Sequence, residues 1–176
     1  MNQKSTSFWS LFAILCMMAC QPPSQKEPAS LDPEQTLLEV NQVMDAWHHA
    51  ASVADSTTYF GSMASPWSIF IGTDDSERWE TSAFKTWSRR YFQRASAWTF
   101  VPVPHSRHIY TRGEVAWLDE KLDSEHMGRC RGTGVLVWDE ASLTWKIDHY
   151  TLSFAVPNAL ADAIVEDITS HEKALE

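Results

Sequence analysis

The feature of the sequence that most constrains its fold is a change in hydrophobic periodicity near residue 98. Upstream, apolar residues recur every three or four positions, as on one face of a helix, whereas downstream they alternate with polar residues, as in half-buried strands. The alternating part predicts four long strands at residues 98–110, 114–123, 127–140 and 143–154, and the short turns between them favour an antiparallel meander. Since such a sheet must cover its apolar face, the predicted fold class is α+β, a curved antiparallel sheet wrapped around N-terminal helices.

The upstream half predicts three helices and two short strands. Asp32 and Pro33 suit the start of a first helix, and one apolar stripe follows at Leu37, Val40, Met44, Trp47, Ala51 and Ala54. Asp55 is expected to cap a short second helix that ends at Gly61. We further expect strands at 67–72 and 78–80, a helix from 81 to about 95, and a C-terminal helix after Asn158 with its stripe at Leu160, Ile164 and Ile168.

The first nineteen residues have the layout of a secretory signal peptide. Lys4 precedes an apolar run from Phe8 to Ala19, which is too short to span a bilayer stably. The run ends in Met17-Met18-Ala19-Cys20, which resembles the lipobox of bacterial lipoproteins, where the cysteine becomes lipidated. Ordinary cleavage without lipidation is one alternative, and an incidental cysteine in an apolar leader is another. We therefore predict residues 1–19 as a signal peptide of the lipoprotein type, and Cys20 as the lipidation site.

Residues 20–30 are expected to be a tether. They contain three prolines and no apolar periodicity. The resulting division is a signal peptide (1–19), a tether (20–30), a folded domain (31–158) and a C-terminal helix (159–176). We expect the protein to be exported to the cell envelope and held at a membrane by lipid on Cys20 alone.

Charge and cysteine content restrict the partners. The formal net charge of −9 argues against binding to nucleic acid or to anionic lipid. Cys16 leaves with the leader and Cys20 would be acylated, so Cys130 has no partner for an intrachain disulfide. Cys130 lies between Arg129 and Arg131, and is either a packed strand residue or an activated thiol.

Four sequence segments carry a resemblance to a known family. They are the first helix with Trp47 and the Ala54-Asp55 step, the strand 113–117, the run 131–137 and the final strand Trp145-Lys146-Ile147-Asp148-His149-Tyr150-Thr151-Leu152-Ser153. In their order and spacing, the region from Val40 to Asn158 resembles the SnoaL-like branch of the nuclear transport factor 2-like (NTF2-like) superfamily. The resemblance implies an α+β cone with a cavity, a fold used by enzymes and by non-catalytic binding proteins that often pair through their sheets.

This sequence departs from its relatives at positions that carry catalysis in the family. Many relatives have a second histidine where this chain has Thr151. The Tyr-Asp-Asp set of ketosteroid isomerases cannot be placed on this sequence. No catalytic constellation is therefore carried over.

Strand alternation proposes which side chains face the cavity. On the last strand it groups His149 and Thr151 with Trp145, Ile147 and Ser153 on one face, which we expect to point inward. With the family's register, Arg131 and Thr133 would share that face. A buried arginine beside a neutral histidine favours an anion or a polarised carbonyl. His149 is the candidate catalytic base, although an interior histidine and an ion-paired arginine can both be purely structural.

Aromatic side chains are the candidate cavity walls, because aromatic concave sites bind flat or apolar molecules. The candidates are Trp47, Trp87, Tyr91, Trp98 and Trp117. They could equally fill a cone that binds nothing. His48 is expected beside them at the cavity mouth, whereas the alternation of Asp119 with Ala116 and Leu118 is expected to point this carboxylate outward.

Three functional hypotheses follow. The first is a lipid-anchored domain that binds a small, partly apolar molecule in its cone, with candidate ligand-binding residues Trp47, His48, Trp87, Tyr91, Trp117, Arg131, Thr133, His149 and Thr151. The second is an enzyme in the same cavity, performing proton transfer or hydrolysis with His149 as base. The third is a dimerisation or assembly module, which an apolar outer face around Val135, Leu136 and Leu152 would support. No cofactor or metal is expected, because the histidines are scattered and HExxH, CxxC and glycine-rich phosphate motifs do not occur.

Overall fold

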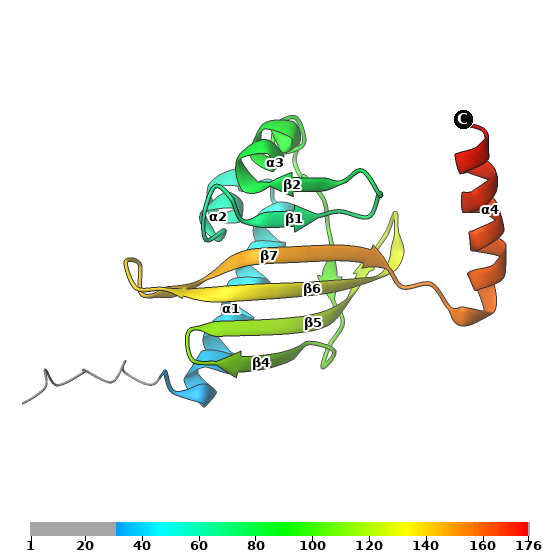
Figure 1. Cartoon of the computed structure of the whole chain (residues 1–176). Coiled ribbons are helices and arrows are strands. Elements are labelled where there is room, and N and C mark those ends of the chain that lie inside the picture. The colour runs from blue at the N-terminus through cyan, green and yellow to red at the C-terminus, as the bar shows by residue number, and fades with distance from the viewer. Residues whose placement is uncertain (1–30, 176) are drawn as a thin grey trace, which may run out of the picture. The chain divides into compact units, whose positions relative to one another are not determined.

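The computed structural model describes residues 31–175, and its centre is a curved sheet of seven strands (Figure 1). The strands are β1 (Ile69–Ile71), β2 (Arg78–Glu80), β3 (Val101–Pro102), β4 (His108–Arg112), β5 (Val115–Ser124), β6 (Gly128–Asp139) and β7 (Thr144–Phe154). Their order is β2-β1-β7-β6-β5-β3, and β4 also pairs with β5. The β5–β6–β7 meander is antiparallel as predicted, whereas β1 joins β7 in parallel.

The helices are α1 (Pro33–Ser52), α2 (Ser56–Gly61), α3 (Thr81–Ser88) and α4 (Ala161–Lys173), with a 3₁₀ turn (Asn158–Leu160) before α4. Helices α1 and α2 begin where the sequence places their caps, whereas α3 begins after Glu80 and α4 after Leu160, without a side-chain cap bond. The Asp32 carboxylate accepts from the backbone N–H of Glu34 at 3.2 Å. The Asp55 carboxylate likewise accepts from the backbone N–H groups of residues 57 and 58. These bonds satisfy N–H groups that have no partner inside the helix.

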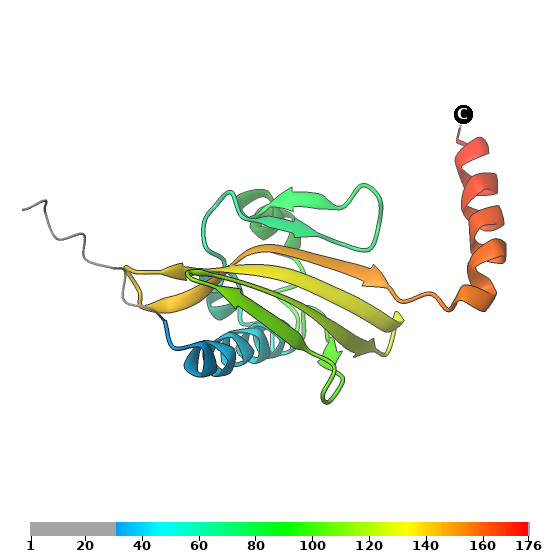
Figure 2. The same cartoon turned by 60° about the horizontal axis from the view of Figure 1, so that its bottom comes forward.

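The helices α1, α2 and α3 cover one face of the sheet, and α1 crosses it beneath β4 to β7 (Figures 1 and 2). Apolar side chains from both layers form one core, which includes Val40, Met44, Trp47, Tyr59, Phe84, Leu118, Leu122, Leu136, Trp145, Ile147 and Tyr150. The α+β cone is therefore the fold of the described chain. Its opposite, outer sheet face is not covered by these helices.

Two elements differ from the sequence-based prediction. The strand expected at 98–110 is only β3 and β4, because Pro102 and Pro104 cannot donate to a ladder and His105 has a φ of 59°. The helix expected to reach residue 95 ends at Ser88, and turns continue the chain. Trp98 and Phe100 consequently lie on an irregular segment between α3 and β3.

A β-bulge interrupts β7 at Asp148. Leu136 of β6 pairs with Ile147 and Val135 pairs with His149, so Asp148 has no partner residue on β6. The buried residues of β7 are accordingly Trp145 and Ile147 before the bulge, and Tyr150 and Leu152 after it. One extra residue thus exchanges the two faces of the strand half-way along its length.

The C-terminal helix α4 has no buried residue. Its expected stripe at Leu160, Ile164 and Ile168 is exposed or half-buried. Within residues 31–175, no helix has both the length and the apolarity to cross a membrane. The predicted signal peptide, tether and Cys20 lie outside the described residues.

Candidate functional site

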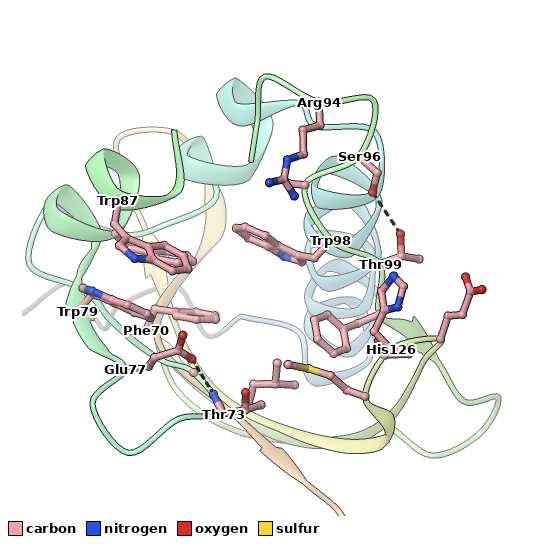
Figure 3. Close-up of a pocket in the computed structure, with 18 residues that line it drawn as sticks. Phe70, Thr73, Glu77, Trp79, Trp87, Arg94, Ser96, Trp98, Thr99 and His126 are labelled. Carbon is pink, nitrogen blue, oxygen red and sulfur yellow. Dashed lines mark hydrogen bonds between the residues drawn. The ribbon is translucent and has the colours of Figure 1, made fainter. Parts of the chain in front are cut away.

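The main concavity is an aromatic pocket of about 430 Å³ at the open side of the cone (Figure 3). The β1–β2 hairpin, α3, the segment before β3 and the turn between β5 and β6 form its walls. Its aromatic lining residues are Phe70, Trp79, Phe84, Trp87, Trp98 and Phe100. A volume of this size suits a small organic molecule.

The aromatic rings of one wall are stacked on one another. The centroids of Phe70 and Phe84 are 4.3 Å apart with nearly parallel planes, and those of Trp79 and Trp87 are 4.7 Å apart. Trp98 lies 5.7 Å from Phe84 between centroids. In Figure 3 it faces Phe70 and Trp87 across the pocket. The pocket therefore presents flat ring surfaces held in place by mutual packing.

Polar and charged side chains complete the lining of this pocket: Thr73, Glu77, Arg94, Ser96, Thr99, Ser124, Glu125 and His126. Glu77 lies on the hairpin wall, where its Oε2 accepts from the backbone N–H of Thr73 at 3.1 Å. Arg94 and His126 lie on other sides of the pocket in Figure 3. The Arg94 guanidinium carbon is 4.7 Å from the centroid of the Tyr91 ring. Charged groups thus border a lining that is otherwise mostly apolar.

A second, much smaller cavity of about 10 Å³ lies deeper in the cone. Phe70, Trp98, Phe100 and Leu152 line both cavities and separate them. Trp47, His48, Tyr59, Leu122 and Tyr150 complete the inner cavity. The inner volume is on the order of that needed by one water molecule.

A buried carboxylate, Glu120, organises the polar groups around this inner end. Its Oε1 is 2.8 Å from His48 Nε2 and accepts from the Tyr150 hydroxyl, also at 2.8 Å. Its Oε2 accepts from Arg107 Nε at 2.8 Å, and Arg107 in turn donates to Asp45 at 2.8 Å. Four elements or segments, α1, β5, β7 and the loop before β4, are joined by this network.

The network keeps Glu120 ionised. Burial by itself would raise the pKa of Glu120, but the hydrogen bond and charge of His48, the charge of Arg107 and the Tyr150 hydroxyl outweigh burial and lower the pKa to about 2. Burial, followed by the negative charge of Glu120, raises the pKa of Tyr150 well above its usual value. Tyr150 is therefore a hydrogen-bond donor to a carboxylate at neutral pH.

Comparisons with known proteins settle the family. The family model for the SnoaL-like domain matches residues 40–157. The chain belongs to the SnoaL-like domain family. No curated protein matches the chain at the level of significance applied.

Solved structures with the same fold are distant in sequence. A candidate dehydratase of the NTF2-like family from Streptomyces avermitilis is 12% identical with a TM-score of 0.61, over 72% of this chain and 100% of that one. An NTF2-like protein of unknown function from Pseudomonas putida KT2440 is 12% identical with a TM-score of 0.56, over 70% and 88%. A cystatin-like protein of unknown function from Nostoc punctiforme is 9% identical with a TM-score of 0.56, over 73% and 96%. At these identities the likeness shows the fold.

The predicted interior placement of His149, Thr151, Arg131 and Thr133 is wrong for this SnoaL-like domain. Arg131 and Thr133 are exposed, and His149 and Thr151 are half-buried on the outer sheet face. The bulge at Asp148 is the physical reason for His149 and Thr151, because it moves the inward positions of β7 to Tyr150 and Leu152. Arg131 and Thr133 pair with Ser153 and Thr151 and therefore share that outer face.

The other candidate residues are divided between the pockets and the outer face. Trp47 and His48 line the inner cavity, and Trp87 lines the aromatic pocket. Tyr91 is half-buried beside Trp87, with centroids 5.1 Å apart, but does not line the pocket. Trp117 lies on the outer face, stacked on Tyr110 at 5.9 Å.

The sequence analysis missed Glu77, Arg107, Glu120 and Tyr150. Asp119 is exposed, as the alternation in β5 predicted. The same alternation places Glu120 with Ala116 and Leu118 on the inner face, and this signal was available. No pattern in the sequence indicates that Arg107, from the loop before β4, reaches Glu120. Among the described residues, no three His, Cys, Asp or Glu side chains are grouped so that they could hold a metal ion.

Proposed function

We propose that this SnoaL-like domain binds a small, flat, partly apolar molecule in its aromatic pocket. The observation that supports the proposal is the pocket itself, with about 430 Å³ of space bounded by six aromatic rings, five of which pack on one another instead of closing the space. Burying a flat apolar body against such rings is favourable, both through the area removed from water and through ring stacking.

The pocket's rings are held by the fold before any ligand enters. Phe84 is buried and packs on Phe70, and Trp79 packs on both Phe84 and Trp87. A site whose rings are already packed loses little conformational entropy on binding. This rigidity supports a binding role for the pocket.

Naphthalen-1-ylmethanol, a flat neutral molecule, is a suitable probe. We expect it to raise the midpoint of thermal unfolding, because binding to the native state stabilises that state. We also expect it to quench tryptophan fluorescence, because Trp79, Trp87 and Trp98 line the pocket. Trp87→Ala should weaken this binding roughly tenfold, the loss of one stacking partner worth about 1–2 kcal/mol. The matched control is Trp67→Ala, since Trp67 is 70% exposed and does not line the pocket. Equal affinity in both variants would contradict the pocket as the binding site.

A second candidate function, acid–base catalysis, is favoured by His48 and Glu120. A histidine whose Nε2 is held 2.8 Å from a buried carboxylate has a fixed ring orientation, as a proton carrier requires. His48 thus replaces His149 as the candidate base. The base stands at the inner cavity, so a substrate must pass Trp98 and Phe100 to meet it.

A carbonyl probe tests this candidate. For 2-tetralone, a flat ketone, catalysis predicts exchange of its α-protons with deuterated solvent, measured by NMR, faster with the wild type than with His48→Gln. Equal exchange rates with the two proteins would exclude His48 as a base for this carbonyl substrate.

The assembly hypothesis is less well supported by the residues on which it depended. Leu136 and Leu152 are buried in the core, and of the three expected outer residues only Val135 lies on the outer face. The outer face also carries Lys121, Arg129 and Arg131. We therefore favour ligand binding in the pocket as the principal role, on a chain that we propose to be exported and lipid-anchored at Cys20.

A further inference from the structure

Glu77 is a half-buried carboxylate fixed on the wall of the aromatic pocket. Its Oε2 accepts from the backbone N–H groups of Thr73 at 3.1 Å and Asp74 at 3.3 Å. The side chain folds over Gly72, whose backbone N–H also donates to the Glu77 carbonyl at 2.8 Å. A methyl group at Gly72 would overlap the Glu77 carboxylate, so the glycine is required for this placement.

The second carboxylate oxygen of Glu77 is left without a protein donor. Within residues 31–175, Oε1 accepts no hydrogen bond and the carboxylate forms no ion pair. Glu77, Gly72 and Thr73 all line the pocket, as do the rings of Phe70 and Trp79 on the same hairpin. A half-buried negative charge therefore borders the binding space with part of its hydrogen-bonding capacity unused.

The surrounding rings reinforce that negative potential. The face of an aromatic ring carries partial negative charge and attracts a cation placed within about 6 Å of its centroid. Trp79 and Trp87 are both half-exposed toward this space and tilted by 34° to one another. Ring faces together with a carboxylate are the chemistry that recognises ammonium groups. Glu125 also lines the pocket, but it is exposed to solvent, whereas Glu77 is half-buried among the rings.

Arg94 is a positively charged residue of the lining, and it is more exposed to solvent than Glu77. It is exposed to solvent, and its guanidinium stands over the Tyr91 ring at 4.7 Å, so a ring already partners its charge. Figure 3 shows Arg94 and Glu77 on opposite sides of the pocket, with Trp98 between their levels. A cation held at Glu77 would therefore be separated from the guanidinium.

We propose that the ligand of this pocket carries a positively charged nitrogen, as a primary or quaternary ammonium group attached to a flat apolar body, and that Glu77 receives the charge. This inference rests on the proposed function of the pocket and adds the chemical class of the ligand. The apolar body lies between the rings, and the nitrogen lies against Glu77 Oε1 and the indole faces.

Three probes of one size test the proposal on the folded domain: naphthalen-1-ylmethylammonium, naphthalen-1-ylmethanol and 1-naphthoate. Calorimetric titration at pH 7 should give the ammonium about fivefold tighter binding than the alcohol, and the carboxylate the weakest, as expected for one partly screened charge pair with a cation–π contribution. The preference for the ammonium should decrease at high salt, because salt screens exposed charges.

Two substitutions isolate Glu77. Glu77→Gln keeps the shape and an acceptor for the backbone N–H groups but removes the charge, so the ammonium and the alcohol should then bind within about twofold of each other. Gly72→Ala keeps the charge but displaces the carboxylate, and should give the same loss of preference. Asp75→Asn is the control, since Asp75 is exposed on the same hairpin outside the pocket and its loss should leave the preference intact.

The outcomes distinguish a failure of the cation site at Glu77 from a failure of the aromatic pocket as a binding site. If the alcohol binds but the ammonium binds no tighter, or if Glu77→Gln keeps the full preference, the cation site is overturned while the aromatic pocket stands. Tightest binding of the carboxylate would also overturn it and would assign the ligand's charge to Arg94. If none of the three probes binds, the aromatic pocket fails as a binding site, and the cation site fails with it.

Discussion

Glu120 is an ionised side chain that three hydrogen-bond donors hold inside this cone. Three donors, from His48, Arg107 and Tyr150, meet its two oxygens at 2.8 Å each. Each donor comes from a different element or loop, so no local segment can form the arrangement by itself. An unpaired buried carboxylate would cost several kcal/mol, and the three bonds offset that cost.

Removing this charge should destabilise the fold. In Glu120→Gln, Arg107 keeps only Asp45 as a charged partner, and we expect a loss of about 3 kcal/mol in the free energy of unfolding at pH 7. Chemical denaturation measures this loss. Asp119→Asn, at the exposed neighbouring position, is the control and should change the free energy by less than about 0.5 kcal/mol.

The same residue predicts a pH dependence. The folded pKa of Glu120 is about 2, below its ordinary value of 4.5, so its contribution to stability is present above about pH 4.5 and is lost as the pH falls toward 2. The Glu120→Gln variant lacks this contribution, and the stability difference between variant and wild type should therefore shrink between pH 5 and pH 3. A difference that stays constant across this range would show that Glu120 does not titrate as its contacts require.

At the scale of elements, period-two alternation predicted the bounds of the long strands well, but predicted only in part which residues face the core. It gave β5, β6 and β7 nearly to the residue, and it placed Asp119 correctly on the outside. It failed on β7 because one unpaired residue, Asp148, exchanges the faces. The bulge is a feature of the pairing with β6, and the Asp148 carboxylate accepts from the Ser68 hydroxyl at 2.8 Å. Such partners are distant in the sequence, so His149 was assigned to the wrong side.

The candidate site was predicted less completely than the strands, for a related reason. Trp87 was identified because aromatic residues are conspicuous in a sequence, whereas Glu77 was passed over because an acidic residue in a polar turn is ordinary. Its significance depends on Gly72 and on rings brought beside it by α3 and by the segment around Trp98. Local pattern therefore identified ring candidates but not the charge beside them.

A matched pair of isoleucines tests whether α4 contributes to the stability of the fold. Ile168 of α4 is 52% exposed, whereas Ile147 of β7 is 0% exposed. We expect Ile147→Ala to lower the free energy of unfolding by about 2–5 kcal/mol and Ile168→Ala to lower it by less than about 0.5 kcal/mol. Denaturant titration of both variants measures the contrast. A comparable loss in both would mean that α4 packs against another surface in solution.

At the scale of the whole molecule, the ligand pocket of the domain and the expected membrane attachment depend on different parts of the chain. The pocket is built entirely from residues between Phe70 and Leu152. The predicted leader and tether precede the described residues, and the net charge of −9 provides no electrostatic attraction to an anionic membrane surface. We propose that membrane attachment comes from lipid on Cys20, in the N-terminal part of the chain.

Expression of the full chain in a bacterial host with a lipoprotein pathway tests this attachment. We expect the wild type to enter the detergent phase on phase separation, and Cys20→Ser to remain in the aqueous phase, because the variant has no thiol at position 20 to lipidate. Cys130→Ser is the matched control, since Cys130 is buried in the folded domain and its loss should not change the partition. Lipid at Cys20 adds about 0.8 kcal/mol of membrane affinity for each buried methylene, so a lipid with more than one acyl chain anchors a protein stably. A processed wild type found wholly in the aqueous phase would contradict the anchor, while leaving the binding of flat ligands to the pocket unchanged.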